Sequence, residues 1–293
     1  MLVSMHTKEL IYRFGLEETL VLLHNAGFDA YDVTLYGKTS RIFNEYFADD
    51  DYVEKANKLR AFSDNIGIVC NQSHAPFFSG QKIEVGSVEF YTVLKTMEVA
   101  SILGAENIVI HPLKHLDYAE NSKLLKEENL RFYGNLIPYA EKYGIRILIE
   151  NMWERNKFTK NITYSVCSTP EEFCEYIDMF DSPYLKACLD IGHAALVGVE
   201  VGNFIKTLGK NRLFGLHVHD NDFISDLHTM PFTSNINFHS ITDALGEIDY
   251  VGDITFESVD YLKKFPDELV PSAARHMCEV GKYLAEQIYR KKC

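Results

Sequence analysis

Six short apolar runs of this chain end in a histidine or a carboxylic acid, the side chains that bind divalent metal ions. A single histidine in such a place is more often hydrogen-bonded structure than a ligand. The repetition over six consecutive runs is what indicates function. In chain order the residues are His74, His111, Glu150, Asp190, His219 and Glu257, with His193 three positions after Asp190.

Three of these residues are acids that would be brought together, namely Glu150, Asp190 and Glu257. The apolar run 147–149 leads directly into Glu150, so the acid is delivered to a pocket with apolar walls. Ionised carboxylates held together there raise one another's pKa unless cations neutralise them. The simplest explanation for these acids is that one to three divalent ions bind there and neutralise their negative charge. Oxygen and imidazole ligands suit Zn²⁺, Mn²⁺, Fe²⁺ or Co²⁺, and Mg²⁺ where carboxylates dominate.

The seventh run contains two histidines, His217 and His219. Because side chains alternate along a strand, both point to the same face. We expect the one nearer the end of the run, His219, to be the ligand, and His217 to support it or to pack. Asp226 and His228 follow in the next loop. An aspartate in a loop often only caps a turn, but their position after the seventh run adds this pair to the candidate ligands.

Parallel strands followed by helices must position these residues. Short β-branched runs alternate with longer segments of helical period, which is typical of βα units. The starts of the eight runs are roughly 30 to 40 residues apart, about one βα repeat. The runs are residues 2–7, 30–36, 66–74, 107–112, 145–151, 185–194, 213–221 and 253–259.

Eight repeats predict an α/β protein, a single (β/α)₈ TIM barrel spanning residues 1–293, with function at the C-terminal ends of the strands. Glycines at 27, 104 and 144 mark helix ends, Ser168, Thr169 and Pro170 mark a helix start, and the last helix is expected at about 272–292. The alternative fold is an open doubly wound sheet, which needs a glycine-rich phosphate loop after an early strand. The sequence has no such motif.

Composition excludes several classes of protein. With 46% hydrophobic and 24% charged residues the chain is an ordinary globular protein. Its 42 acidic and 29 basic residues give a net charge of −13, which repels nucleic acid. Neither a signal segment nor an apolar run of about 20 residues is found, so we expect a cytoplasmic chain with no membrane partner.

The cysteines are scattered and form no C-x-x-C pair, which argues against a disulfide framework and against a thiolate zinc site. We expect reduced, mostly structural thiols. The oligomeric state stays open, a homo-oligomer included. The cysteines are Cys70, Cys167, Cys174, Cys188, Cys278 and Cys293.

In its strand order and ligand types the chain resembles the xylose-isomerase-like TIM-barrel superfamily, which includes sugar isomerases, ketose 3-epimerases, inosose dehydratases and endonuclease IV. The resemblance spans nearly the whole chain. In the isomerase and epimerase branch it implies that one divalent ion is bound by four residues and that the two glutamates among them move protons on opposite faces of the substrate. It also implies a substrate contact for His193. The four residues are Glu150, Asp190, His219 and Glu257.

The endonuclease branch binds three zinc ions, and the resemblance implies a residue of the right type for every ligand. The four residues above match the second zinc. The first is matched by His74, His111 and Glu150, and the third by His193, Asp226 and His228. With a single ion, these histidines would contact the substrate instead. The chain departs from the endonuclease because residues 229–233 lack glycine, and from the epimerases because no arginine closely follows His219.

We therefore expect a metal-dependent isomerase or epimerase of a small sugar, sugar phosphate or polyol, acting through an enediolate. Glu150 and Glu257 would transfer the proton, His193 would steady the oxyanion, and Trp153 would stack on the sugar. A zinc-dependent phosphodiester hydrolase of the endonuclease IV kind is the rival, opposed by the acidic charge. A non-catalytic sugar-binding barrel is the third alternative.

Overall fold

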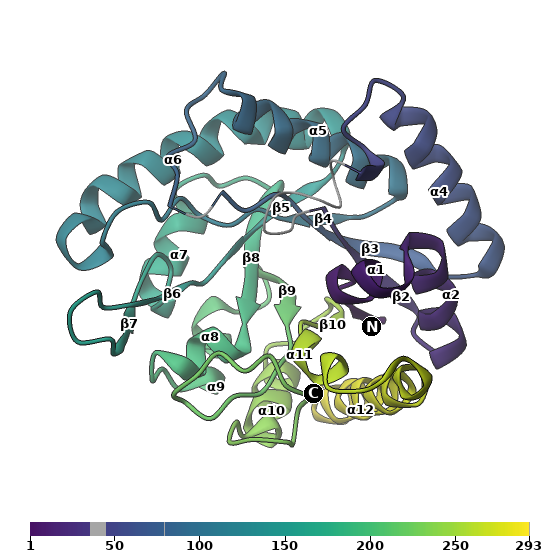
Figure 1. Cartoon of the computed structure of the whole chain (residues 1–293). Coiled ribbons are helices and arrows are strands. Elements are labelled where there is room, and N and C mark those ends of the chain that lie inside the picture. The colour runs from purple at the N-terminus through teal and green to yellow at the C-terminus, as the bar shows by residue number, and fades with distance from the viewer. Residues whose placement is uncertain (36–44, 79, 293) are drawn as a thin grey trace.

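A ring of parallel strands surrounded by helices forms the chain, as Figure 1 shows. This computed structural model describes residues 1–35, 45–78 and 80–292. Each of the eight predicted runs contains one strand, although the last residue of the second run, Tyr36, lies outside the described residues, as does Cys293. The eight strands are β1 Val3–Met5, β2 Ala30–Thr34, β3 Val69–His74, β4 Asn107–Val109, β5 Arg146–Glu150, β8 Leu185–Asp190, β9 Leu213–His217 and β10 Ile254–Phe256.

The hydrogen-bonded ladder is continuous over six parallel strands in the order β2-β3-β4-β5-β8-β9, and β1 and β10 form a separate parallel pair. Two isolated bridges link the pair to the edges of the larger sheet. One joins His6 to Asp32 of β2, and the other joins Val218, just after β9, to Phe256 of β10. The expected order of strands is therefore present, as a six-stranded ladder and a pair rather than as one ladder of eight.

Helices cover the outer face of the strands (Figure 1). The glycine helix ends are confirmed: Gly27 and Gly144 have φ of 96° and 64°, left-handed values that glycine adopts without strain. The last helix begins two residues earlier than expected. The helices are α1 Lys8–Phe14, α2 Leu16–Ala26, α4 Tyr52–Ile66, α5 Val88–Leu103, α6 Tyr118–Tyr143, α7 Pro170–Asp178, α8 Ile191–Leu196, α9 Val201–Leu208, α10 Phe238–Glu247, α11 Val259–Lys263 and α12 Val270–Lys291, with a 3₁₀ turn at Asp267–Leu269.

Alternation along the strands decides which side chains enter the ring. Leu148 and Cys188 pack together in a small apolar cluster separate from the main core, and a Cβ on Gly215 would touch both of them. These residues belong to the inner face of β5, β8 and β9. Two positions further along each strand the same face carries Glu150, Asp190 and His217. An apolar layer therefore lies directly beneath the polar side chains.

One antiparallel hairpin was not predicted. Strands β6 (Trp153–Arg155) and β7 (Ile162–Tyr164) pair just after β5 and project from the ring (Figure 1). Phe158 in its connecting loop is 79% exposed. In the described part of the chain, no helix combines the length and the apolar character needed to cross a membrane.

Candidate metal centre

Four buried side chains converge above the apolar layer, and we call them the carboxylate site: Glu150, Asp190, His217 and Glu257. Each offers one ligand atom, and these atoms all lie within 4.8 Å of one another. His217 contacts both glutamates: its Nδ1 lies 3.4 Å from Glu150 Oε1 and 3.2 Å from Glu257 Oε2. Asp190 Oδ2 is 3.8 Å from the same nitrogen. Three acids and one imidazole are a donor set for a divalent cation.

The histidine of this site differs from the expected one. Strand β9 ends at His217, and the ladder pairs His217 with Asp190, so the two lie at the same level. His219 is two residues further along the chain and lies one layer further out. The expectation that His219 stands among the acids is therefore corrected to His217. The reason is the register of the ladder between β8 and β9, which a single run of sequence does not determine and which places His217 opposite Asp190.

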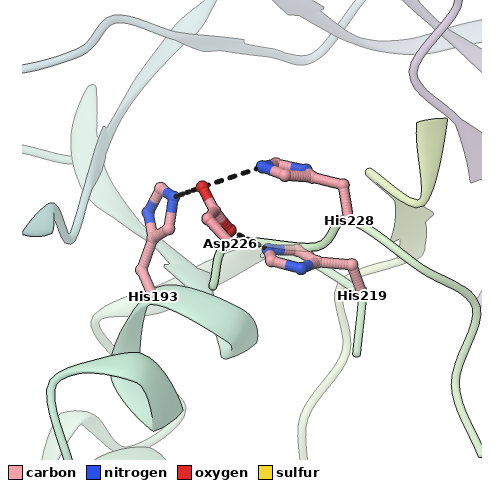
Figure 2. A group of neighbouring side chains, drawn as sticks. All are labelled: His193, His219, Asp226 and His228. Carbon is pink, nitrogen blue, oxygen red and sulfur yellow. Dashed lines mark hydrogen bonds and ion pairs between the residues drawn. The ribbon is translucent and has the colours of Figure 1, made fainter. Parts of the chain in front are cut away.

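His219 belongs instead to a second group, which we call the histidine site: His193, His219, Asp226 and His228 (Figure 2). The three imidazoles surround the carboxylate of Asp226. Asp226 Oδ2 lies 3.0 Å from His228 Nε2 and 3.5 Å from His193 Nε2, and Asp226 Oδ1 lies 4.0 Å from His219 Nε2. His219 Nε2 also lies 3.0 Å from Asp190 Oδ1, so the two sites are adjacent.

A third group of potential ligands is formed by His74, His111 and Glu150, and it shares Glu150 with the carboxylate site. His111 Nε2 lies 2.7 Å from Glu150 Oε2. His74 Nδ1 lies 3.0 Å from the buried carboxylate of Asp32, and Gln72 Nε2 donates to the other oxygen of Asp32 at 2.8 Å. The structure thus brings together every residue that the sequence proposed as a ligand.

Sequence reasoning missed Asp32 and Gln72, which orient the ligands from behind. Gln72 Nε2 is also 3.2 Å from His217 Nε2. The signal for Asp32 was present, because it is a charged residue in the middle of a strand whose five residues are all buried. A buried charge needs a partner. Nothing in the sequence indicated that Asp32 would contact His74 or that Gln72 would contact His217.

Electrostatics keep the two glutamates ionised. Burial alone raises the pKa of Glu150, but the adjacent His217 and His111 outweigh it and hold the pKa well below the usual value. The pKa of Glu257 is lowered in the same way, with burial opposed mainly by His217. Burial lowers the pKa of His217, but Cys188, Glu150 and Glu257 outweigh it and raise this pKa well above the usual value, so the positive imidazole balances the carboxylates when no metal ion does. A cation at this place would compete with those protons.

The histidine site shows the same balance. Burial disfavours the charged form of His228, yet Asp226 raises its pKa to about 10. Burial works against the charge of His193 as well, and Asp190 and Asp226 raise its pKa well above the usual value. The pKa of Asp226 is correspondingly low, because His193 and His228 outweigh its burial.

The residues present fit a divalent ion at both sites. His217 Nδ1 and Glu257 Oε2 are buried, and neither makes a hydrogen bond of good geometry to any residue that the structure describes. The same holds for Asp226 Oδ1 at the histidine site. Buried polar atoms without a well-aligned hydrogen bond are costly. Their convergence on common points is explained by a cation that would satisfy them.

Trp153 and Lys114 line the edge of the centre. The indole N–H of Trp153 donates to Asp226 Oδ2 at 3.2 Å, which is a supporting contact rather than an open stacking face. Stacking of Trp153 on a sugar stays a prediction. Lys114, which the sequence did not single out, donates through Nζ to the backbone oxygen of Trp153. Burial lowers the pKa of this lysine.

The fold and the centre together define a class. The chain belongs to the xylose isomerase-like TIM barrel family, whose sequence profile matches residues 20–280. The TIM-barrel fold expected from the sequence is thereby confirmed.

Two curated relatives come from Methanocaldococcus jannaschii, and both are uncharacterized proteins. One is 30% identical over 193 residues, which are 63% of this chain and 63% of the relative. The other is 29% identical over 195 residues, 64% of this chain and 69% of the relative. The first alignment thus covers less than two thirds of that relative's length.

Solved structures resemble the chain over almost its whole length. A D-tagatose 3-epimerase-like protein superposes with a TM-score of 0.76 at 22% identity, covering 99% of both chains. D-psicose 3-epimerase from Clostridium cellulolyticum H10, solved with D-tagatose, gives 0.74 at 15% identity and covers 100% of both. IolI protein with a bound zinc atom gives 0.72 at 19% identity and covers 99% of both. At these identities the likeness establishes the fold alone.

Proposed function

We propose that this chain is a divalent-metal-dependent isomerase or epimerase of a small sugar, sugar phosphate or polyol. One observation carries the proposal: two buried carboxylates, Glu150 at the end of β5 and Glu257 just after β10, lie within 3.4 Å and 3.2 Å of the same nitrogen of His217. Two carboxylates at one substrate pocket can take a proton and return it. The structural neighbours that are epimerases support this reaction class, and the zinc of IolI supports the use of a metal.

We assign the ion of this reaction to Glu150, Asp190, His217 and Glu257. A bound divalent ion supplies a Lewis acid, which polarises a carbonyl and acidifies the adjacent C–H bond. One of the two glutamates removes that proton, which leaves an enediolate, and the other glutamate delivers a proton back. Their low pKa values provide the unprotonated carboxylate that the first step requires.

The remaining residues would position the substrate and exclude water. His111 pairs with Glu150 and therefore orients the carboxylate that receives or donates the proton. His193 Nδ1 lies 3.2 Å from Glu150 Oε1, and this histidine is the candidate for steadying a developing oxyanion. The apolar layer of Leu148 and Cys188 closes the pocket from below.

The decisive experiment uses Glu150→Gln and Glu257→Gln with a panel of ketoses, sugar phosphates and polyols in D₂O. The wild-type protein should introduce deuterium at the carbon beside the carbonyl of its substrate. Each substitution should abolish turnover, because an amide cannot act as the base. Glu279→Gln, on an exposed face, is the matched control and should stay active. A fully active Glu257→Gln protein, folded by circular dichroism, would contradict the proposal.

A second candidate function is metal-dependent hydrolysis of a phosphate ester. The observation in its favour is that three ligand groups lie near one another, two of which share Glu150, so the centre has donors for three ions. Several ions can activate water and stabilise a leaving oxygen. The charge of −13 opposes nucleic acid as the substrate. Cleavage of an abasic-site duplex with zinc would favour hydrolysis, and no cleavage at low salt would eliminate the DNA version.

A further inference from the structure

We propose that His219 closes the coordination of a divalent ion at the histidine site, so that this ion is structural and fastens the loop after β9 to helix α8. The assignment of chemistry to the neighbouring carboxylate site rests on the proposed function. The structural ion is inferred separately, from the contacts among the residues of the histidine site. Zinc, or another divalent ion that accepts imidazole nitrogen, is the class of ligand.

The first support is the number and type of donors. Three imidazoles and one carboxylate offer four atoms within 4.8 Å of one another. Four protein ligands fill a tetrahedral ion, whereas catalytic zinc sites typically use three and keep one position for water or substrate. His193, Asp226 and His228 alone would leave that position open. His219 is the fourth donor, and Figure 2 shows its ring beside the carboxylate of Asp226.

The second support is how the rings are held from behind. His193 Nδ1 lies 2.9 Å from the backbone oxygen of Asn151, and His228 Nδ1 lies 2.9 Å from the backbone oxygen of Glu257. A carbonyl oxygen can only accept, so each Nδ1 carries the proton. Both rings therefore present Nε2 to the centre of the group. Such a contact behind the ring is the usual arrangement of a metal-binding histidine.

The third support is a space reserved for His219. A Cβ built on Gly192 would overlap the imidazole of His219, so only glycine at this position admits the ring. Gly192 lies in the first turn of α8, next to His193. His219 and His228 stack with ring centroids 4.2 Å apart and an angle of 9° between their planes. The backbone of α8 and the ring of His228 thus fix His219 from two sides.

The fourth support concerns what the ion would join. His219, Asp226 and His228 all belong to the segment between β9 and α10, whereas His193 belongs to α8. His228 has φ of 41°, a left-handed value that a non-glycine residue adopts only when its surroundings require it. An ion at the histidine site therefore cross-links the loop to the helix, and the backbone is bent to deliver its ligand.

The test compares retained zinc in wild type and four variants after dialysis against a mild chelator. Wild type should keep one ion per chain more than His219→Ala, whose zinc affinity should fall by more than the roughly 10- to 100-fold cost of losing a ligand's supporting partner. His219→Cys should restore retention, because a thiolate also binds zinc. Gly192→Ala should lose the ion without removing a ligand. Gly134→Ala is the control, since its added Cβ meets only Phe180 at 3.5 Å.

Two further measurements report on the coordination and on the loop. Co²⁺ at this site should give a four-coordinate visible spectrum in wild type and a higher-coordinate one in His219→Ala. Chymotrypsin should cleave after Phe223, which is 49% exposed, faster in His219→Ala than in zinc-loaded wild type. Cleavage after Phe158, which lies in the exposed loop between β6 and β7 and belongs to neither site, should stay unchanged and serves as the internal standard.

Equal zinc retention and equal cleavage in wild type and His219→Ala would overturn the inference. So would failure of His219→Cys to restore the ion, since His219 would then only support Asp190. These readouts do not depend on turnover. A protein that converts no sugar but loses one zinc with His219 would contradict the proposed function and leave the structural ion standing.

Discussion

The carboxylate site and the histidine site are neighbours, yet they are built in different ways. The first takes its residues from the ends of three strands and the position just after a fourth, above a packed apolar layer. The second takes three of its four residues from one loop. Strand ends hold ligands in a fixed frame, whereas a loop needs something to hold it. The comparison separates a site suited to chemistry from one suited to cross-linking.

The strongest test of this difference between the two sites is to substitute one histidine at a time. His217→Asn should lower kcat/KM by roughly a thousandfold or more, because several kcal/mol of charge stabilisation depend on this ligand and 1.36 kcal/mol corresponds to a factor of ten. His219→Asn should lower it much less. Steady-state kinetics on the substrate found in the panel would decide. Equal losses in the two variants would show that both sites take part in the reaction.

A smaller effect should follow from Asp32→Asn, which weakens the hold on His74 without touching a ligand. Loss of such a supporting carboxylate should reduce metal affinity by roughly 10- to 100-fold. Competition with a coloured chelator measures it. The reduction should be confined to the ion nearest His74. Retention of all ions at wild-type affinity would show that His74 is a substrate contact rather than a ligand.

The pH dependence of metal binding tests whether His228 is a ligand at the histidine site. The pKa of His228 in the folded, metal-free chain is about 10, raised from 6.5. Its ion pair with Asp226 therefore stabilises the metal-free fold fully below about pH 6.5, and this contribution is lost as the pH rises through about 10. Because the proton competes with the ion, affinity should rise over the same window, by up to about tenfold per pH unit. Titrations at several pH values would show it. A flat profile would exclude His228 as a ligand.

The smallest effect is expected for Trp153→Phe, which keeps an aromatic ring but removes the N–H from which Asp226 Oδ2 accepts. One such hydrogen bond is worth about 1 kcal/mol, so zinc retention at the histidine site should weaken several-fold. Trp153→Tyr is a control that also lacks this indole donor and should behave alike. A higher KM for the sugar with unchanged metal affinity would instead support the stacking role predicted from the sequence.

Much of the fold could be predicted because alternation and spacing are local properties. All eight runs contain a strand, and Glu150 and Asp190 each end one, while Glu257 directly follows another. The choice between His217 and His219 could not be made locally. It depends on the ladder between β8 and β9, which pairs Asp190 with His217 and is a contact between segments far apart in sequence.

The supporting residues were beyond sequence reasoning for the same reason. Asp32 and Gln72 are ordinary polar residues until β2 pairs with β3 and the fold brings His217 of β9 within reach of Gln72. The hairpin of β6 and β7 was missed because its strands are only three residues long and are rich in polar side chains. Short pairings of this kind depend on the surface beneath them more than on their own composition.

The apolar layer beneath the carboxylate site has a consequence for how this protein can change over time. Leu148, Cys188 and the space above Gly215 are set by strand packing, whereas the histidine site and the hairpin belong to segments outside the ladder. A mutation in those segments leaves the packed layer intact. The barrel can therefore acquire a new substrate by exchanging exposed loop residues while the packed layer stays unchanged. A library at the exposed positions of 152–165 and 220–236 that keeps Asp226 and His228 should retain a high proportion of folded variants.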